Sequence, residues 1–340
     1  HIHLAVLLLR AASHRPDGLA AVRSLAALHA PALSGDVRWR LHAEVASVCL
    51  RLGDVDAAAA ALQEAMATAP AQAAWKPQLL AARLWAGRDA AKADAVLRVC
   101  AEQAGPRGAA LVAVERCRQA ELQGDAAGAR AAALEALELA DDWKLAIAAV
   151  VALLRQGRAG DALRACEEAT RRFPATGRVW GLRVMLARTR GVDAQREALR
   201  NALRNAPKSG EVWCEAARLA AADGDLYHAK LYLGYAQAFT PQYGDLYVER
   251  LRVCILARDN AGLWETVAAC LHAEPTYGLL WGVLREEGVS PLETLRRAFQ
   301  ALRTTLCAGI SLGAFETYLA VPKMSMAARR RFVLNAELKA

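Results

Sequence analysis

Apolar residues recur at intervals of three and four positions along most of this chain, in segments that glycine or proline separates. The segment Val212–Pro241 shows the pattern most clearly. Its first half carries Trp213 and several alanines on one face, Gly224 interrupts it, and its second half carries Leu233. Such spacing predicts two amphipathic helices joined by a tight turn. The second helix ends at the proline, because proline lacks a backbone N–H and clashes with the preceding turn.

The junctions between such helix pairs repeat a short frame, Pro-x-x-Gly-x-(Val or Leu)-(Trp or Tyr). Its four copies begin at Pro174, Pro207, Pro241 and Pro275 and end at Trp180, Trp213, Tyr247 and Trp281. The prolines follow one another at steps of 33, 34 and 34 residues. A fixed period of this length indicates a repeat architecture in which each helix pair stacks on its neighbours. We expect each proline to end one pair and each aromatic to pack at the start of the next.

The same plan extends over most of the chain. Its copies are Asp36–Pro70, Trp75–Pro106, Leu111–Asp141, Trp143–Pro174, Val179–Pro207, Val212–Pro241, Leu246–Pro275 and a last one from Leu280. They predict an all-α fold of about eight helix pairs, in which Trp39 and Trp143 act as the later aromatics do. Residues 35–304 hold the tandem repeats, residues 1–34 a partial N-terminal repeat, and residues 305–340 C-terminal capping helices. Because the chain begins at His1 inside an apolar run, we expect it to be a piece of a longer protein.

These positions resemble the tetratricopeptide repeat (TPR), a 34-residue helix pair with tryptophan, small residues and a final proline at fixed places. Aligning Pro241 with that final proline places Trp213 on the family's tryptophan and three alanines on its small-residue positions. The junctions Pro207–Trp213 and Pro275–Trp281 are similar to the half-a-TPR (HAT) repeats of RNA-processing scaffolds. They also look like the C-terminal repeats of spliceosomal tri-snRNP bridging scaffolds. The resemblance implies a right-handed α-α superhelix that serves as an interaction scaffold.

Composition limits the partners and the cellular compartment that we expect for the protein. The chain carries 43 lysine and arginine residues against 35 acidic ones, a formal net charge of +8, which is compatible with nucleic-acid or acidic-protein partners. None of the eight cysteines forms a Cys-x-x-Cys pair, which favours a reducing, intracellular compartment. The nucleus, the cytoplasm and an organelle all stay open. The longest apolar runs are too short to cross a bilayer, so we expect no membrane span.

Candidate catalytic chemistry is sparse. The seven histidines share no metal-ligand spacing with Cys, Asp or Glu. The chain has neither a phosphate-binding glycine loop nor a Gly-x-Ser-x-Gly nucleophile motif. We therefore predict no catalytic residue, no metal site, no cofactor and no small-molecule substrate, so the protein is not expected to be an enzyme.

The sharpest charge pattern is a basic stripe at four-residue intervals: Arg196, Arg200, Arg204 and Lys208. Because like charges at this spacing cost roughly a few tenths of a kcal/mol each, the stripe does not serve helix stability. It suits phosphates or an acidic protein surface, and an ordinary solvated convex face is the alternative. By the TPR resemblance, Arg218 and Arg252 lie among aliphatic residues of the concave groove. We take these six basic residues as candidate contacts to a partner protein or to RNA.

Two functions from different classes remain. The first is a non-catalytic scaffold that holds several proteins in a large multi-subunit assembly, with an RNA-processing ribonucleoprotein complex as a candidate. The second is a helical-repeat protein that contacts the RNA backbone through its arginine-rich faces. Repeat proteins that read RNA place variable polar residues at one position of every repeat, and the absence of such a series favours the scaffold. Tyr232, Tyr235 and Phe239 follow helical spacing, so we expect them to pack between repeats rather than to stack on bases.

Overall fold

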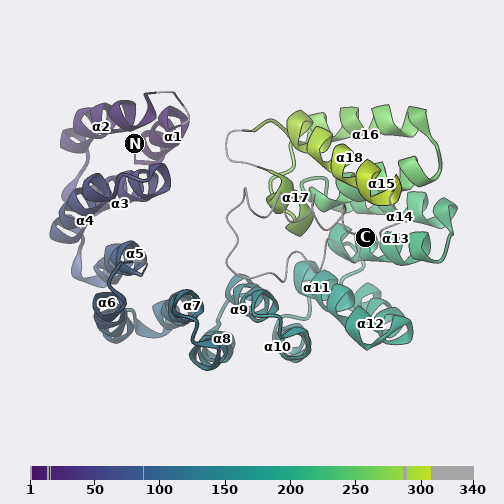
Figure 1. The fold of residues 1–340 in the computed structure, drawn as a ribbon, viewed down its shortest axis with the longest axis horizontal. Coiled ribbons are helices and arrows are strands. Elements are labelled where there is room, and N and C mark those ends of the chain that lie inside the picture. The colour runs from purple at the N-terminus through teal and green to yellow at the C-terminus, as the bar shows by residue number, and fades with distance from the viewer. Residues whose placement is uncertain (1, 14, 16, 87, 286–288, 308–340) are drawn as a thin grey trace. The chain divides into compact units, whose positions relative to one another are not determined.

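The computed structural model describes residues 2–13, 15, 17–86, 88–285 and 289–307 (Figure 1). These residues form eighteen α-helices and three short 3₁₀ helices, and no β-strand occurs among them. The all-α helical-repeat class predicted from the sequence is therefore confirmed. The predicted capping segment, residues 305–340, lies outside the described residues from 308 onward.

The helices follow one another as pairs along the chain. The pairs are α1 (Ile2–Ala12) with α2 (Gly18–His29), α3 (Gly35–Leu52) with α4 (Val55–Thr68), α5 (Trp75–Trp85) with α6 (Ala90–Gln103), α7 (Gly105–Gln123) with α8 (Ala126–Leu139), α9 (Trp143–Arg155) with α10 (Ala159–Arg172), α11 (Gly177–Ala187) with α12 (Val192–Asn205), α13 (Gly210–Ala222) with α14 (Leu226–Phe239), α15 (Asp245–Leu256) with α16 (Asn260–Ala273), and α17 (Leu279–Leu284) with α18 (Pro291–Cys307). The 3₁₀ helices are Ala30–Ala32, Ala71–Ala73 and Arg188–Arg190. The segment before Pro31 thus holds two helices.

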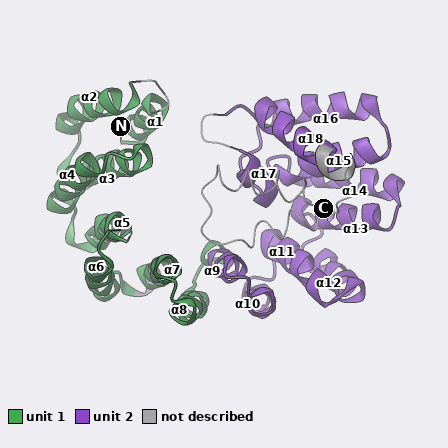
Figure 2. Ribbon diagram, in the orientation of Figure 1, with its two compact units in different colours: residues 1–145 green, residues 146–340 purple. Residues whose placement is uncertain are grey.

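The chain divides into two compact units, residues 1–145 and residues 146–340 (Figure 2). The division falls inside the predicted array of residues 35–304. In the first unit, Leu9, Leu41 and Leu62 are fully or almost fully buried among alanines such as Ala46 and Ala58. The short alanine side chains allow the helices to approach closely. In the second unit the core is built around larger side chains, namely Leu233, Leu246, Tyr247, Trp281 and Leu302.

A glycine followed by an aspartate joins the two helices of several pairs. Gly53 takes a left-handed conformation (φ 85°) that ends α3, and the Asp54 carboxylate accepts a hydrogen bond from the Ala57 N–H at 2.9 Å. Such a cap satisfies one of the backbone donors that the first turn of α4 leaves free. The same geometry recurs at Gly124-Asp125 and at Gly224-Asp225. The glycine ends one helix and the aspartate begins the next, which fixes the tight turn of the pair.

The proline-to-aromatic frame is closed by a hydrogen bond in three of its four copies. The Nε1 atoms of Trp180 and Trp213 donate to the carbonyls of Pro174 and Pro207, both at 2.7 Å. The Tyr247 hydroxyl donates to the Pro241 carbonyl at 2.9 Å. The aromatic therefore provides a donor to the carbonyl of the proline, which lies just beyond the end of the preceding helix. Packing at the start of each pair, which the sequence predicts, is accompanied by a directional bond.

The fourth copy departs from this rule. The Pro275 carbonyl accepts a hydrogen bond from Arg285 Nη1 at 3.0 Å instead. Trp281 is 0% exposed, and its Nε1 atom has no hydrogen-bond partner among the described residues. The earlier anchors also differ from one another: the Trp39 Nε1 atom donates to the Asp36 carbonyl at 3.0 Å, and Trp143 is half-buried.

The glycine of the frame is where the next repeat approaches most closely. A Cβ atom on Gly244 would lie 2.1 Å from Cγ of the buried Trp281 ring. We expect Gly244→Ala to lower the free energy of unfolding of the second unit by about 2–3 kcal/mol, because the added methyl group overpacks this contact. Urea-induced unfolding followed by tryptophan fluorescence measures the change.

Gly234 provides the matched control for this substitution. It lies inside α14, and a Cβ atom added there meets nothing within 4 Å. Gly234→Ala is expected to raise the free energy of unfolding by about 0.5–1 kcal/mol, since alanine restricts the unfolded chain more than glycine does. Equal effects of the two substitutions would contradict the close contact between Gly244 and Trp281.

Candidate partner-binding surfaces

The predicted basic stripe lies on α12 and at its end, and all four of its residues are exposed. Arg196 forms an ion pair with Asp223 at 3.0 Å. For Arg200, Arg204 and Lys208, by contrast, the described residues contain no ion-pair partner. Three of the four cations therefore remain available to an anionic group of a partner.

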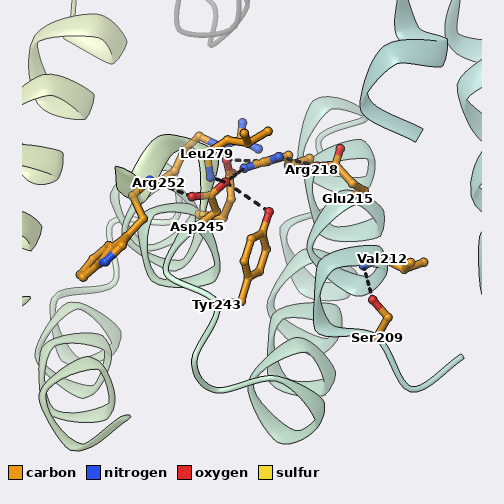
Figure 3. A network of polar contacts seen from close by, with 10 residues as sticks. Ser209, Val212, Glu215, Arg218, Tyr243, Asp245, Arg252 and Leu279 are labelled. Atoms are coloured by element: carbon orange, nitrogen blue, oxygen red, sulfur yellow. Dashed lines mark hydrogen bonds and ion pairs between the residues drawn. The ribbon is translucent and has the colours of Figure 1, made fainter. Parts of the chain in front are cut away.

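Arg218 and Arg252 occupy a different environment. Their side chains are only 13% and 11% exposed, because they are enclosed between the first helices of neighbouring pairs. Arg218 Nε donates to Glu249 at 2.8 Å, and its Nη1 atom donates to Glu215 (Figure 3). Arg252 Nε donates to the other oxygen of Glu249 at 2.7 Å. The structure thus places both arginines in an internal ion network, and their contact with a partner stays a prediction.

Asp245 extends this network to the following pair. Its carboxylate accepts hydrogen bonds from the backbone N–H groups of Leu279 at 3.0 Å and Trp281 at 2.8 Å, at the start of α17. The Tyr243 hydroxyl donates to the same carboxylate at 3.2 Å (Figure 3). An acidic side chain of α15 therefore caps a helix of the next pair, 34 residues and more along the chain. This bond fixes the stacking of one repeat on the next.

The electrostatics of the network reflect its burial. Desolvation raises the pKa of Asp245 and of Glu215, although the nearby Arg218 guanidinium opposes that shift. Burial also acts to raise the pKa of Glu249, but Arg252 and Arg218 outweigh it and hold that pKa below its usual value. A buried carboxylate in this position is stable only because it is paired with cations.

A second group of contacts joins residues from α11, from α13 and from the segment between α16 and α17. Glu211, which is buried, accepts hydrogen bonds from the hydroxyls of Ser209 at 2.7 Å and Tyr277 at 2.6 Å. Arg178 Nε donates to the same carboxylate at 3.3 Å. The Arg178 guanidinium also lies 3.5 Å from the centroid of the Tyr277 ring, a distance at which a cation is attracted to the ring face. Residues of α11, α13 and the loop before α17 thus meet at one carboxylate.

The sequence contains a signal for this network that no local motif reveals, namely charges that recur at the repeat period. Glu211, Glu215 and Arg218 of α13 recur as Asp245, Glu249 and Arg252 of α15, each after 34 residues. The recurrence of charges at the repeat period, on the helix that packs against both neighbouring pairs, indicates structural pairing. An isolated arginine on an aliphatic helix gives no such indication of structural pairing.

The aromatic residues of α14 divide between packing and exposure. Tyr232 is half-buried, and its ring centroid lies 5.5 Å from that of Trp213, as the expected packing between repeats requires. Tyr235 also contacts Trp213, at 4.9 Å, but it remains exposed. Phe239 is exposed as well, and its packing between repeats stays a prediction. Phe239 follows Tyr235 by one helical turn, so the two residues lie on the same face of α14.

No group of three or more His, Cys, Asp or Glu side chains among the described residues is placed to hold a metal ion. None of their helices combines the length and apolar character needed to cross a membrane.

Comparisons with known proteins agree with this architecture. The family described as PRP6, TPR-like domain, matches residues 2–301. The chain belongs to the PRP6 TPR-like family. A TPR-containing protein of Dictyostelium discoideum is 35% identical over 141 residues, which is 41% of this chain and 11% of that protein. The chain therefore spans about a tenth of the length of this curated relative.

Solved structures share the fold at low sequence identity. Yeast Tom70 is 13% identical, with a TM-score of 0.50, and the match covers 88% of this chain and 63% of that one. Pseudomonas aeruginosa PilF is 15% identical, with a TM-score of 0.39, over 60% of this chain and 93% of that one. The PRP6 TPR-like family consists of helical-repeat scaffolds for protein interactions, and such repeats are in general not catalytic.

Proposed function

We propose that this PRP6 TPR-like domain is a non-catalytic scaffold that holds partner proteins within an RNA-processing ribonucleoprotein assembly. The family match over residues 2–301 is the observation that supports this most strongly. The ion network of the second unit supports it physically, because it holds α13, α15 and α17 in fixed register. A repeat array of fixed geometry presents its surfaces to partners without the ordering cost that a flexible array incurs.

Direct contact with RNA is the second candidate function. It rests on Arg200, Arg204 and Lys208, which are exposed and lack an ion pair among the described residues. Such cations bind phosphates with an affinity that falls steeply as salt increases. Binding of this kind adds to the scaffold function without replacing it.

A reducing, intracellular compartment is the setting that we propose for the protein. Seven of its cysteines are free and buried in the structure. Burial raises the pKa of the Cys100 thiol to about 11, so that this thiol is protonated and unreactive at neutral pH. These cysteines act as small apolar core residues, which matches a setting where disulfides do not form.

Affinity purification of the full-length protein, with quantitative mass spectrometry of the co-purifying proteins, tests the proposal. We expect a defined set of proteins that survives both ribonuclease treatment and a wash at high salt, because apolar burial carries such contacts. Arg200→Glu combined with Arg204→Glu separates the two candidates, since it should abolish RNA binding that depends on the stripe. RNA recovered alone, with an affinity that collapses as salt rises, would overturn the scaffold in favour of the RNA-binding function.

A further inference from the structure

The outer face of α14 carries a second stripe, made of large apolar side chains. We call it the aromatic stripe, and it consists of Tyr227, Leu231, Tyr235 and Phe239. These residues are 75%, 41%, 41% and 43% exposed, respectively. Their four-residue spacing places them on one face of the helix, over a length of about 18 Å. The stripe thus equals about three turns of a partner helix in length.

Contacts at both ends link α12, which carries the basic stripe, to α14 through residues between them. At one end, Arg196 Nη2 lies 3.0 Å from a carboxylate oxygen of Asp223, in the turn before α14. At the other end, the Pro207 carbonyl accepts the bond from Trp213, whose ring packs on Tyr235. The two helices are the second members of successive pairs. Arg200 and Arg204 follow Arg196 at intervals of four residues, so they lie on the same face of α12 as the residue that reaches Asp223, and Lys208 comes just after the end of that helix.

We propose that this joint surface binds an amphipathic helix of a partner protein that carries acidic residues along one edge. The apolar side chains of that helix lie on the aromatic stripe, and its carboxylates face Arg200, Arg204 and Lys208. This inference rests on the proposed scaffold function and specifies the chemistry of one partner. Charge complementarity is the main argument for this partner helix. Arg200, Arg204 and Lys208 are exposed, lack an ion pair among the described residues and belong to the repeat next to the apolar face. Tyrosine and arginine are also the side chains that dominate binding energy at protein interfaces.

The surroundings of the stripes favour a helix over a single-stranded RNA. Exposed carboxylates, Asp223 and Asp225, stand at the start of α14, where they repel the phosphate that every RNA nucleotide carries, whereas a partner helix can have its carboxylates away from this end. Arg196, the nearest cation, is already paired with Asp223. Within the aromatic stripe Leu231 has no ring on which a base stacks, and the Tyr235 ring meets Trp213 at an interplanar angle of 62°. Regular stripes at four-residue intervals match the anchors of a helix laid against a helix.

The experiment screens the full chain against a displayed library of helices of about 18 residues. Their apolar face is randomised, and their flanking positions are all glutamate or all lysine. We expect enrichment of the glutamate-flanked helices. The tightest of them then serves as the probe in fluorescence anisotropy, beside an oligouridine of about 12 nucleotides. Arg200→Glu with Arg204→Glu is expected to weaken probe binding at least about tenfold, and so is Tyr227→Ser with Leu231→Ser.

Arg98→Glu is the matched control. Arg98 is exposed on α6 in the first unit and also lacks an ion pair among the described residues, so its reversal should leave probe binding unchanged. Thermal unfolding of each variant verifies that it is folded. The proposal is overturned if glutamate- and lysine-flanked helices are enriched alike, or if neither is enriched. It is also overturned if the oligouridine binds more tightly than the probe and loses affinity in the same variants. If the partner proteins co-purify normally with both double variants, the proposal for this binding surface is wrong, and the proposed scaffold function is unaffected.

Discussion

Arg218→Met is expected to lower the free energy of unfolding of the second unit by about 3–5 kcal/mol. Arg218 is the cation that contacts Glu215 and Glu249 and lies 3.8 Å from Asp245. Methionine fills a similar volume but has no charge, so three buried carboxylates lose their shared partner. An uncompensated buried charge is far more costly than the original ion pair is stabilising. Urea-induced unfolding, followed by circular dichroism and tryptophan fluorescence, measures the loss.

The pH dependence of this loss identifies its cause. Without Arg218 the pKa values of Glu215 and Asp245 in the folded state rise, because the largest influence that lowers them is removed, and the pKa of Glu249 rises less because Arg252 still lowers it. A carboxyl group whose pKa is raised on folding destabilises the protein above that pKa and ceases to do so as the group is protonated. The deficit of the variant is therefore expected to be complete at neutral pH and to shrink as the pH falls toward the raised values.

Arg196→Met is the control that removes an exposed ion pair instead of a buried one. Arg196 and its partner Asp223 are 45% and 47% exposed, and exposed pairs contribute less than about 1 kcal/mol. A deficit in Arg218→Met that does not change with pH would show that the loss comes from packing and not from the buried carboxylates. A deficit as small as that of Arg196→Met would show that the network is solvated.

The sequence was sufficient for the helical repeats because their signals are local. Pro207 and Trp213 lie six residues apart, and Gly224 with Asp225 marks the turn between α13 and α14. Each of these features acts within one repeat, through backbone conformation, capping or helix termination. The helix pairs expected from Trp39 to Pro275 accordingly appear in the structure, with differences of a few residues at their ends.

The candidate contacts were harder to predict because burial depends on neighbours far along the chain. Arg218 and Arg200 look alike in the sequence, since both are arginines inside helices. Arg218 is enclosed because Glu249, 31 residues later, stands on the adjacent first helix. Arg200 lies on a second helix, where the described residues bring no carboxylate to it. The helical period identifies the face on which a residue lies, but the stacking of the repeats decides whether another helix covers that face.

Trp281→Ala is expected to lower the free energy of unfolding of the second unit by about 3–5 kcal/mol, as removal of a fully buried tryptophan does. Trp281 is 0% exposed and packs in the same core as Leu246, Tyr247 and Leu302. The space left behind adjoins Gly244, which has no side chain to fill it. The backbone of α17 is in addition held by Asp245, so it cannot readily collapse into the cavity. Urea-induced unfolding, followed by circular dichroism, measures the change.

Phenylalanine at the same position separates packing from hydrogen bonding. Trp281→Phe is expected to change the free energy of unfolding by no more than about 1 kcal/mol, because it removes a buried donor that has no partner among the described residues. Trp180 is the matched control, since it is only 5% exposed and its Nε1 atom donates to the Pro174 carbonyl at 2.7 Å. Trp180→Phe loses that bond and is expected to cost about 1–2 kcal/mol. If Trp281→Phe instead costs more than Trp180→Phe, the Trp281 indole N–H is hydrogen-bonded in solution, and the fourth copy of the frame follows the rule of the other three.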